Sequence, residues 1–379
     1  MKIVYCHRCV YNPGGMERVM LAKIAWLVRH GYEVSIVTTD QKGLPPFFPI
    51  PEGVKMTDLE INYADDNQKN PLLKIVGYLW RRRMHRKRLT AYLMKEKADI
   101  VISLYPCESS FIPAIKDGSK KILELHFNKF FRLQYCRSGI LGAIDKMRTR
   151  SDERLVRKFD KFVVLTKEDA GYWGALPNLE VIPNAALMKA PAEVAHSDCR
   201  RVIAVGRLDF QKGFDRLVEA WALIPPEKRK GWRLDIFGQG EWLRMLDEMI
   251  ERKGIQDSAR VNPPTKDIEK EYLASSFLVM SSHWEGLPMV LIEAMALGLP
   301  AVCFDFKCGP KDVIEDGVNG LLVPEGNVQA LADRMAFLME RPELLEKMRT
   351  EALRIREKYT EEAVMAKWEH CFKSLVKTV

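Results

Sequence analysis

The same order of segments begins twice in this sequence, once at residue 3 and again at residue 201. Each time, a short apolar run leads into a glycine-containing loop, and apolar residues at helical spacing follow the loop. Strands that alternate with helices along a chain form parallel sheets covered on both faces. The pattern therefore predicts an α/β fold of two Rossmann-like, doubly wound domains whose carboxyl strand ends face each other across a cleft.

The length of the chain agrees with two hydrophobic cores, because 379 residues exceed what one core ordinarily supports. We place the domain boundary near Pro183-Asn184, before a polar, alanine-rich segment at 185–199 that resembles a linker. The first domain is then 1–184 and the second is 185–360. The final stretch, 361–379, carries an apolar stripe that needs a surface to cover, and we expect it to pack back on the first domain.

Short apolar runs bounded by turn residues locate the expected strands. In the first domain they are 3–5, 33–37, 99–103, 121–125 and 161–165. In the second domain they are 201–206, 233–237, 259–261, 277–280, 300–304 and 320–323. The first helix of the second domain is expected at 214–223.

Two features lead us to expect neither a membrane-spanning nor a secreted protein. No window approaches the roughly 18 consecutive apolar residues of a spanning helix, and Met1 opens into a strand-like run without the pattern of a secretory signal. We therefore expect a cytoplasmic protein. Cys6-His7-Arg8-Cys9 has the spacing of a zinc or redox pair, but the remaining cysteines form no matching pair, so we interpret it as incidental and expect no metal site.

Positive charge is concentrated in the first half of the chain, where residues 1–184 contain 31 Lys and Arg against 20 Asp and Glu. Within it, the segment 79–89 interleaves Arg and Lys with apolar residues, which suits an anionic membrane surface or a diphosphate-lipid acceptor. A position at the inner face of the plasma membrane is one hypothesis, and a solvated helix face is the alternative. A nucleic-acid partner is not expected, because no stacking platform or base-reading motif accompanies the charge.

The residues best suited to bind a ligand follow the expected strand at 277–280 in a loop that opens a helix. The amides of Leu287, Met289 and Val290 lie near the start of that helix, where they lack intrahelical partners and suit phosphates or sugar hydroxyls. An acceptor inside the helix, Glu293, suits a ribose diol, and Glu285 in the loop suits the hydroxyls of a hexose. An arbitrary pair of glutamates would more often be solvated surface charges.

The block from Glu285 to Glu293 resembles the E-x(7)-E signature of family four of the glycosyltransferases, which are retaining enzymes with the two-domain GT-B fold. The likeness extends over essentially the whole chain. It implies transfer of a sugar from a nucleotide donor, with Glu285 among the catalytic residues. It also implies that Leu287, Met289, Val290 and Glu293 bind the donor.

A second segment, 206–213, resembles the family's G-R-L-x-x-x-K-G motif, whose arginine and lysine bind the donor diphosphate. Departure of a nucleoside diphosphate leaves negative charge on the leaving group, and fixed cations offset that charge without a metal. The chain also contains no D-x-D triplet. We therefore assign Arg207 and Lys212 to catalysis and expect metal independence, with no cofactor besides the donor.

Two residues of the first domain match the family as well. Gly14-Gly15 resembles the glycine-rich first loop, which closes over the donor phosphate, so the resemblance assigns Gly15 to donor binding. His126, after the expected strand at 121–125, matches a histidine near the donor sugar, and the resemblance places it among the catalytic residues, where it positions the sugar and supports the transition state. Without the resemblance, a glycine pair before a helix is more often only a turn, and a histidine at a strand end is more often structural.

The identity of the donor and acceptor depends on finer likenesses. The segment 262–265 replaces a glycine-containing turn that lines the nucleobase pocket in the family, so the base stays open. The segments 304–310 and 314–320 look like branches that build bacterial capsule and exopolysaccharide, whose members generally use UDP-sugars.

The predicted function is therefore transfer of a hexose or N-acetylhexosamine from a UDP-sugar to a glycan or lipid-linked acceptor in bacterial polysaccharide synthesis, with retention. The main alternative is an enzyme of the same fold that acts on soluble sugars, as a synthase, phosphorylase or epimerase. A nucleotide-dependent dehydrogenase is disfavoured, because no G-x-G-x-x-G fingerprint follows the first strand of either domain.

Overall fold

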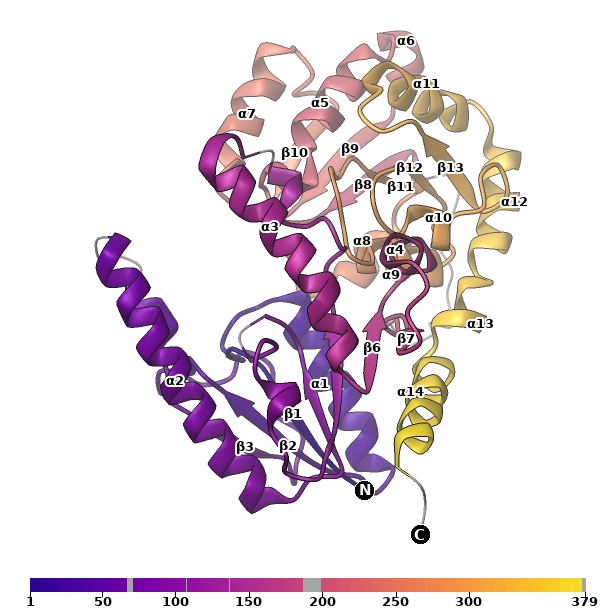
Figure 1. Cartoon of the computed structure of the whole chain (residues 1–379). Helices are drawn as coiled ribbons and strands as arrows, with labels where there is room; N and C mark the ends of the chain where they lie inside the picture. The colour runs from indigo at the N-terminus through magenta and orange to yellow at the C-terminus, as the bar shows by residue number, and fades with distance from the viewer. Residues whose placement is uncertain (67–70, 107, 136, 187–198, 377–379) are drawn as a thin grey trace. The chain divides into compact units, whose positions relative to one another are not determined.

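The computed structural model describes residues 1–66, 71–106, 108–135, 137–186 and 199–376. It divides the chain into two compact units, each built on its own sheet (Figure 1). The first unit comprises Met1–Leu165, Ala170–Pro183 and Val364–Val379, and the second comprises Thr166–Asp169 and Asn184–Ala363. Most of the expected linker lies at 187–198, outside the described residues.

The sheet of the first unit is parallel throughout its described strands, in the order β3-β2-β1-β4-β5-β6-β7. Their bounds are β1 (Lys2–Cys6), β2 (Glu33–Thr38), β3 (Lys55–Asp58), β4 (Ile100–Ser103), β5 (Lys120–Leu125), β6 (Lys161–Val164) and β7 (Leu179–Val181). The strand order reverses between β1 and β4. In open α/β sheets such a switch point leaves a crevice at the carboxyl ends of the two strands.

The helices of the first unit are α1 (Gly15–Arg29), α2 (Pro71–Glu96) and α3 (Gly139–Leu155), together with α14 (Glu361–Leu375) from Val364 onward. Helix α4 (Lys167–Trp173) belongs to the first unit from Ala170 onward. The apolar stripe of α14 is buried within this unit. There Phe372 meets Tyr32 edge to face, and the Tyr32 hydroxyl donates a hydrogen bond of 2.8 Å to Glu369. The C-terminal helix therefore packs beside the end of α1.

The second unit has its own parallel sheet, in the order β10-β9-β8-β11-β12-β13. Its strands are β8 (Arg201–Val205), β9 (Arg233–Phe237), β10 (Ala259–Asn262), β11 (Phe277–Met280), β12 (Ala301–Phe304) and β13 (Gly320–Val323). Its helices are α5 (Phe214–Leu223), α6 (Pro226–Arg229), α7 (Leu243–Arg252), α8 (Ile268–Leu273), α9 (Met289–Ala296), α10 (Pro310–Val313), α11 (Val328–Met339), α12 (Pro342–Ala352) and α13 (Ile355–Tyr359). The switch point of this sheet lies between β8 and β11.

The two doubly wound parallel sheets confirm the predicted α/β class. Every expected strand is present, with ends that differ by a residue or so, and the structure adds the edge strands β3 and β7. Among the described helices, none combines the length and the apolar character that crossing a bilayer requires.

Candidate functional site

The loops that leave β8 and β11 meet at the switch point of the second unit. The hydroxyl of Ser281 donates to the carbonyl of Lys212 at 3.0 Å, and the amide of His283 donates to the carbonyl of Gln211 at 2.8 Å. At Gly213 the backbone is left-handed, with φ of +58°, and a Cβ there would lie 2.4 Å from the Ser281 carbonyl oxygen. Only glycine permits this close approach without a shift.

This approach brings together two residues that the sequence assigns to catalysis. Lys212 Nζ lies 2.7 Å from Oε1 of Glu285, and the side chains are 14% and 10% exposed. The Ser282 hydroxyl donates to the same oxygen at 2.9 Å, and Gln211 Nε2 donates to Oε2 at 3.3 Å. The carboxylate is therefore held by an ammonium and two neutral donors, which offsets the cost of burying it.

Arg207 lies on the same loop but is much more accessible, with 69% of its side chain exposed. Its Nε lies 3.4 Å from Oδ2 of Asp209, and an Nη atom donates to Gln211 at 3.0 Å. Asp209 also caps the short 3₁₀ turn at Phe210–Lys212, because its carboxylate accepts from the Lys212 amide at 3.3 Å. The loop thus presents one shielded cation and one open cation.

The Glu285 loop is also tied to the loop after β12. The Glu285 amide donates to the Lys307 carbonyl at 3.1 Å, and the Cys308 amide donates to the Glu285 carbonyl at 3.3 Å. Pro288 is the N-cap of α9, so Met289 and Val290 lie in the first turn, where amides have no intrahelical carbonyl.

The remaining predicted donor residues differ in exposure. Leu287 is buried just before α9, whereas Met289 and Val290 are half-buried. Glu293 lies inside α9 and is only 5% exposed. Glu293 is therefore almost entirely shielded from solvent.

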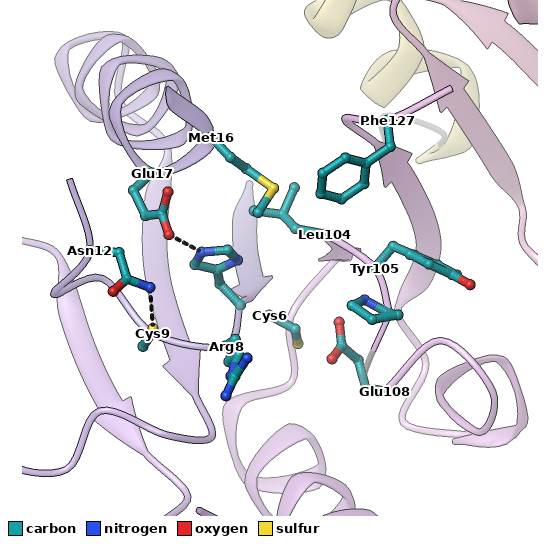
Figure 2. A pocket seen from close by; sticks show the side chains of 12 residues that line it. Cys6, Arg8, Cys9, Asn12, Met16, Glu17, Leu104, Tyr105, Glu108 and Phe127 are labelled. Carbon is teal, nitrogen blue, oxygen red and sulfur yellow. Dashed lines mark hydrogen bonds and ion pairs between the residues drawn. The ribbon is translucent and has the colours of Figure 1, made fainter. Parts of the chain in front are cut away.

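A second candidate region lies at the switch point of the first unit (Figure 2). A cavity of about 220 Å³ opens where β1 and β4 end, and its lining includes His7, Glu17, Tyr105, Glu108 and Phe127. Aromatic rings beside carboxylates are the side chains that commonly hold a sugar, because the rings pack on its carbon face and the oxygens accept from its hydroxyls.

The pKa values of two carboxyl groups in this cavity are shifted in opposite directions. Burial raises the pKa of Glu108, and a hydrogen bond from Ser103 only partly opposes that rise. Burial would also raise the pKa of Glu17, but contact with His7, whose Nε2 lies 3.4 Å away, holds it below its usual value. Carboxyl groups with opposed pKa shifts in one cavity are characteristic of functional sites.

The two first-domain residues predicted from the sequence flank this cavity. Gly15 is the first residue of α1, next to the lining residues Met16 and Glu17, and a Cβ at Gly15 would meet no atom within 4 Å. His126 directly follows β5, next to the lining residue Phe127. Its Nε2 lies 3.1 Å from Oε1 of Glu124.

Cys6 and Cys9, which we interpreted as an incidental pair, are both buried free thiols in the structure. The Asn12 side-chain amide donates to Cys9 at 3.3 Å. Among the described residues, no group of three or more His, Cys, Asp or Glu is arranged to hold a metal ion.

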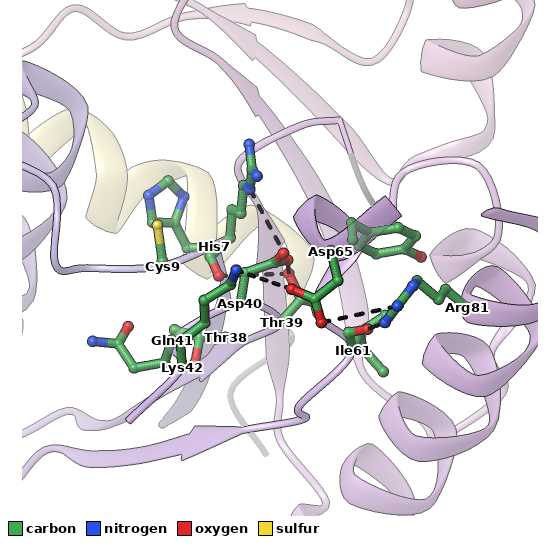
Figure 3. A network of polar contacts seen from close by, with 12 residues as sticks. His7, Cys9, Thr38, Thr39, Asp40, Gln41, Lys42, Ile61, Asp65 and Arg81 are labelled. Carbon is green, nitrogen blue, oxygen red and sulfur yellow. Dashed lines mark hydrogen bonds and ion pairs between the residues drawn. The ribbon is translucent and has the colours of Figure 1, made fainter. Parts of the chain in front are cut away.

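The basic segment 79–89 lies on α2, and part of its charge is used within the first unit (Figure 3). Arg81 donates to the Ile61 carbonyl and lies 3.9 Å from Asp65, and Arg88 donates to the Leu59 and Glu60 carbonyls. The side chains of Arg83, Arg86 and Lys87 are exposed. A row of exposed apolar residues precedes them on α2: Leu73, Ile75, Val76, Tyr78, Leu79 and Trp80.

Sequence reasoning missed His7, Glu17, Glu108 and Glu124. His7 directly follows β1, but no family match pointed to it, whereas the resemblance singled out His126, and Cys6 and Cys9 drew attention to a metal motif instead. For the three glutamates no local motif was available. Glu17 and Glu108 line one cavity because they follow the neighbouring strands β1 and β4, and Glu124 lies on β5, the next strand of the sheet.

Family models match both halves of the chain. Residues 13–186 match the model described as Glycosyltransferase Family 4, and residues 190–354 match Glycosyl transferases group 1. The chain is 28% identical over 361 residues to an uncharacterized glycosyltransferase of Haemophilus influenzae, and the alignment covers 94% of this chain and 96% of the relative. It is 27% identical over 376 residues to the amylovoran biosynthesis glycosyltransferase AmsD of Erwinia amylovora, with 95% and 96% covered.

Solved structures agree in fold. The crystal structure of a mutant of S. aureus TarM, in complex with fondaparinux, alpha-GlcNAc-glycerol and UDP, superimposes with a TM-score of 0.74 at 18% identity, covering 98% of this chain and 99% of that one. Together with the E-x(7)-E block and the two parallel sheets, these matches show that the chain is a glycosyltransferase, a member of family four with the GT-B fold.

Proposed function

We propose that this glycosyltransferase moves a hexose or N-acetylhexosamine from a UDP-sugar to a glycan or diphosphate-lipid-linked acceptor in polysaccharide synthesis, with retention at the anomeric carbon. Two observations on relatives support the proposal. AmsD is named for amylovoran biosynthesis, and the TarM complex contains UDP and alpha-GlcNAc-glycerol.

The contact between Lys212 and Glu285 carries the proposal for the donor site. An ammonium held 2.7 Å from a carboxylate is available to exchange that partner for an oxygen of the donor diphosphate. Arg207 supplies a second and more accessible charge on the same loop. Amides in the first turn of α9 add fixed dipoles for a phosphate, and Glu293 accepts from the ribose.

In the proposed reaction, the bond between the anomeric carbon and the diphosphate oxygen breaks as the acceptor oxygen forms its bond on the same face of the sugar. The acceptor proton passes to the departing phosphate oxygen. Lys212 and Arg207 stabilise the charge of the UDP that leaves, so we propose that no metal ion is required. Glu285 and His126 orient the sugar.

The cavity at the switch point of the first unit is the proposed binding site for a sugar of the acceptor. Phe127 and Tyr105 offer aromatic faces, and Glu17 and Glu108 offer oxygens to sugar hydroxyls. Gly15 begins the helix that carries Glu17, where the absence of a side chain leaves room for a ligand.

A screen of nucleotide sugars tests the proposed function. Thermal shift and hydrolysis are measured with UDP-, GDP- and ADP-sugars, with and without a chelator, because a true donor stabilises the folded state by mass action. We expect stabilisation and slow hydrolysis with a UDP-hexose or UDP-N-acetylhexosamine, unaffected by the chelator. Stabilisation by a GDP- or ADP-sugar alone would refute the donor assignment, and loss of turnover with the chelator would refute metal independence.

A further inference from the structure

Glu124, near the end of β5, lies between a lysine and the histidine assigned to the site. Lys23 Nζ of α1 donates to both carboxylate oxygens at 2.6 Å. His126 Nε2 lies 3.1 Å from Oε1. The side chains of Lys23, Glu124 and His126 are 6%, 1% and 6% exposed, so the whole row is shielded from water.

The His126 ring lies close to Glu124, but its orientation does not align a hydrogen bond between Nε2 and the carboxylate. Within the described part of the chain, His126 Nε2 is buried without an aligned hydrogen-bond partner. The Glu124 oxygen at 3.1 Å is therefore the acceptor that a small rotation of the ring would engage. Hydrogen bonds of catalytic groups are often poorly aligned in unliganded structures and tighten when substrate binds.

Glu124 is held in its ionised form. Burial alone would raise the pKa of Glu124, but the ammonium of Lys23, with a smaller contribution from the contact with His126, lowers it to about 2. An ionised carboxylate only accepts hydrogen bonds. A histidine ring that faces it must therefore carry a hydrogen on the facing nitrogen, Nε2, which leaves Nδ1 as the acceptor of a neutral ring.

Lys23 is itself held in place by the C-terminal helix. Its Nζ lies 3.9 Å from the ring centroid of Trp368 on α14 and 5.5 Å from the centroid of Tyr5 on β1. A cation over an indole ring is attracted by the ring quadrupole, most strongly where water is excluded. The row thus runs from α14 through α1 to β5 and ends at His126.

A purely structural role explains this row poorly. A buried ion pair contributes little net stability, because desolvation of two charges costs about as much as their attraction returns, and apolar replacements are often neutral or stabilising. The row instead ends at the histidine that borders the cavity. Glu17 on α1 also exerts its charge on His126, but Glu17 is already engaged by His7.

We infer that Glu124 is a positioning residue for His126, and that Lys23 and Trp368 hold its carboxylate so that the ring keeps one orientation and a hydrogen on Nε2. This inference rests on the proposed role of His126 in the transfer. It adds the C-terminal helix to the parts of the fold that support the site.

A double-mutant cycle tests the inference, with kcat and the donor KM measured for wild type, Glu124→Gln, His126→Ala and the double variant. Glu124→Gln should lower kcat about tenfold to a hundredfold with little change in donor KM, because it misplaces the ring that orients the sugar while the cations proposed to bind the diphosphate, Lys212 and Arg207, stay in place. In the His126→Ala background the same change should have no further effect. An equal loss of kcat in both backgrounds would overturn the inference.

Two further variants separate positioning from folding. Lys23→Met/Glu124→Gln removes both charges, which avoids leaving a buried ammonium unpaired, and it should be folded with the same low kcat. Asp117→Asn removes a buried pair with Lys121, whose side chain lies on the opposite face of β5, and it should leave kcat unchanged. A folded Lys23→Met/Glu124→Gln variant with wild-type kcat refutes the positioning role.

Nitrogen NMR of histidine-labelled protein reports which ring nitrogen of His126 carries the hydrogen, and it does so independently of turnover. We expect the His126 ring to carry its hydrogen on Nε2 in wild type and to lose this preference in Glu124→Gln. If His126→Ala keeps full kcat while the NMR preference is present, the proposed catalytic role of His126 fails and the contact stands. If the preference is absent in wild type, the inference itself fails.

Discussion

The ammonium of Lys212 lies 2.7 Å from a carboxylate oxygen of Glu285, although 73 positions separate the two residues in the chain. Each residue comes from a different motif that resembles the family, one after β8 and one after β11. Neighbouring parallel strands bring their carboxyl ends together, which is why the two motifs form one site. The pair defines the part of the second unit where a diphosphate and a sugar are expected to meet.

Replacement of Lys212 by alanine should reduce turnover far more than stability. The change leaves Glu285 with the donors Ser282 and Gln211, so we expect unfolding free energy to fall by only about 1–3 kcal/mol. Loss of a fixed cation at the leaving group should lower kcat by about a hundredfold or more. Steady-state kinetics and urea unfolding check the two effects.

Lys253→Ala is the matched control, because Lys253 forms an exposed pair with Glu219 at 3.3 Å on the same unit. It should leave both kcat and stability nearly unchanged. Normal turnover in Lys212→Ala would remove the lysine from the reaction.

Two glycines should respond to alanine in opposite ways. Gly213→Ala should destabilise the second unit, because its Cβ would lie 2.4 Å from the Ser281 carbonyl oxygen at a left-handed backbone position. Gly15→Ala should keep the thermal midpoint of the wild type, since a Cβ there meets no atom within 4 Å. If Gly15 makes room for substrate, transfer should nevertheless fall in the stable variant.

Thermal unfolding measures the stability of both variants, and transferase assays measure their activity. Full activity in Gly15→Ala would show that the glycine serves only the turn before α1. A Gly213→Ala protein as stable as wild type would contradict the close approach of the two loops.

The order of strands and helices was predictable because central strands of a parallel sheet are continuous apolar runs. The edge strands were not. Lys55–Asp58 is mostly polar and partly exposed, and Leu179–Val181 has three residues, all half-buried. Neither segment has a sequence pattern that distinguishes a strand from a loop. Both are strands because a neighbouring strand supplies their hydrogen bonds.

The candidate site also contains residues that the sequence could predict and residues that it could not. Lys212 and Glu285 belong to segments with a family signature, so their neighbourhood was predictable, although their roles remain predictions. Glu124 and Lys23 lie 101 positions apart, and neither has a local motif. Their contact follows from how α1 packs on β5, which a single sequence does not reveal.

The exposed apolar row on α2 predicts binding to anionic membranes. Ile75 and Trp80 are each 58% exposed, and Arg83 and Lys87 are exposed further along the helix. Such a helix inserts its apolar side chains among lipid tails while its cations meet anionic headgroups. Ile75→Ser/Trp80→Ser should therefore reduce flotation with anionic vesicles at low salt.

Leu243→Ser is the control for this experiment, because Leu243 is 45% exposed on the second unit. It should float as the wild type does. Equal flotation of the α2 variant and the control, or no flotation of the wild type with any vesicle, would exclude the membrane role.

Stability should fall as the pH drops from 6.5 to 4 because of His85, which is buried on α2 at 1% exposure beside Tyr63. Burial lowers its pKa from 6.5 to about 4, so the unfolded chain binds a proton in this range while the folded protein does not. The contribution of His85 to the free energy of unfolding is complete above pH 6.5 and is lost progressively toward pH 4, by about 3 kcal/mol in total.

His85→Gln should flatten this part of the profile of urea unfolding against pH, whereas His370→Gln, at an exposed position, should keep the wild-type slope. An unchanged slope in His85→Gln would mean that burial does not lower the pKa of this histidine, so that it binds protons equally in the folded and unfolded states.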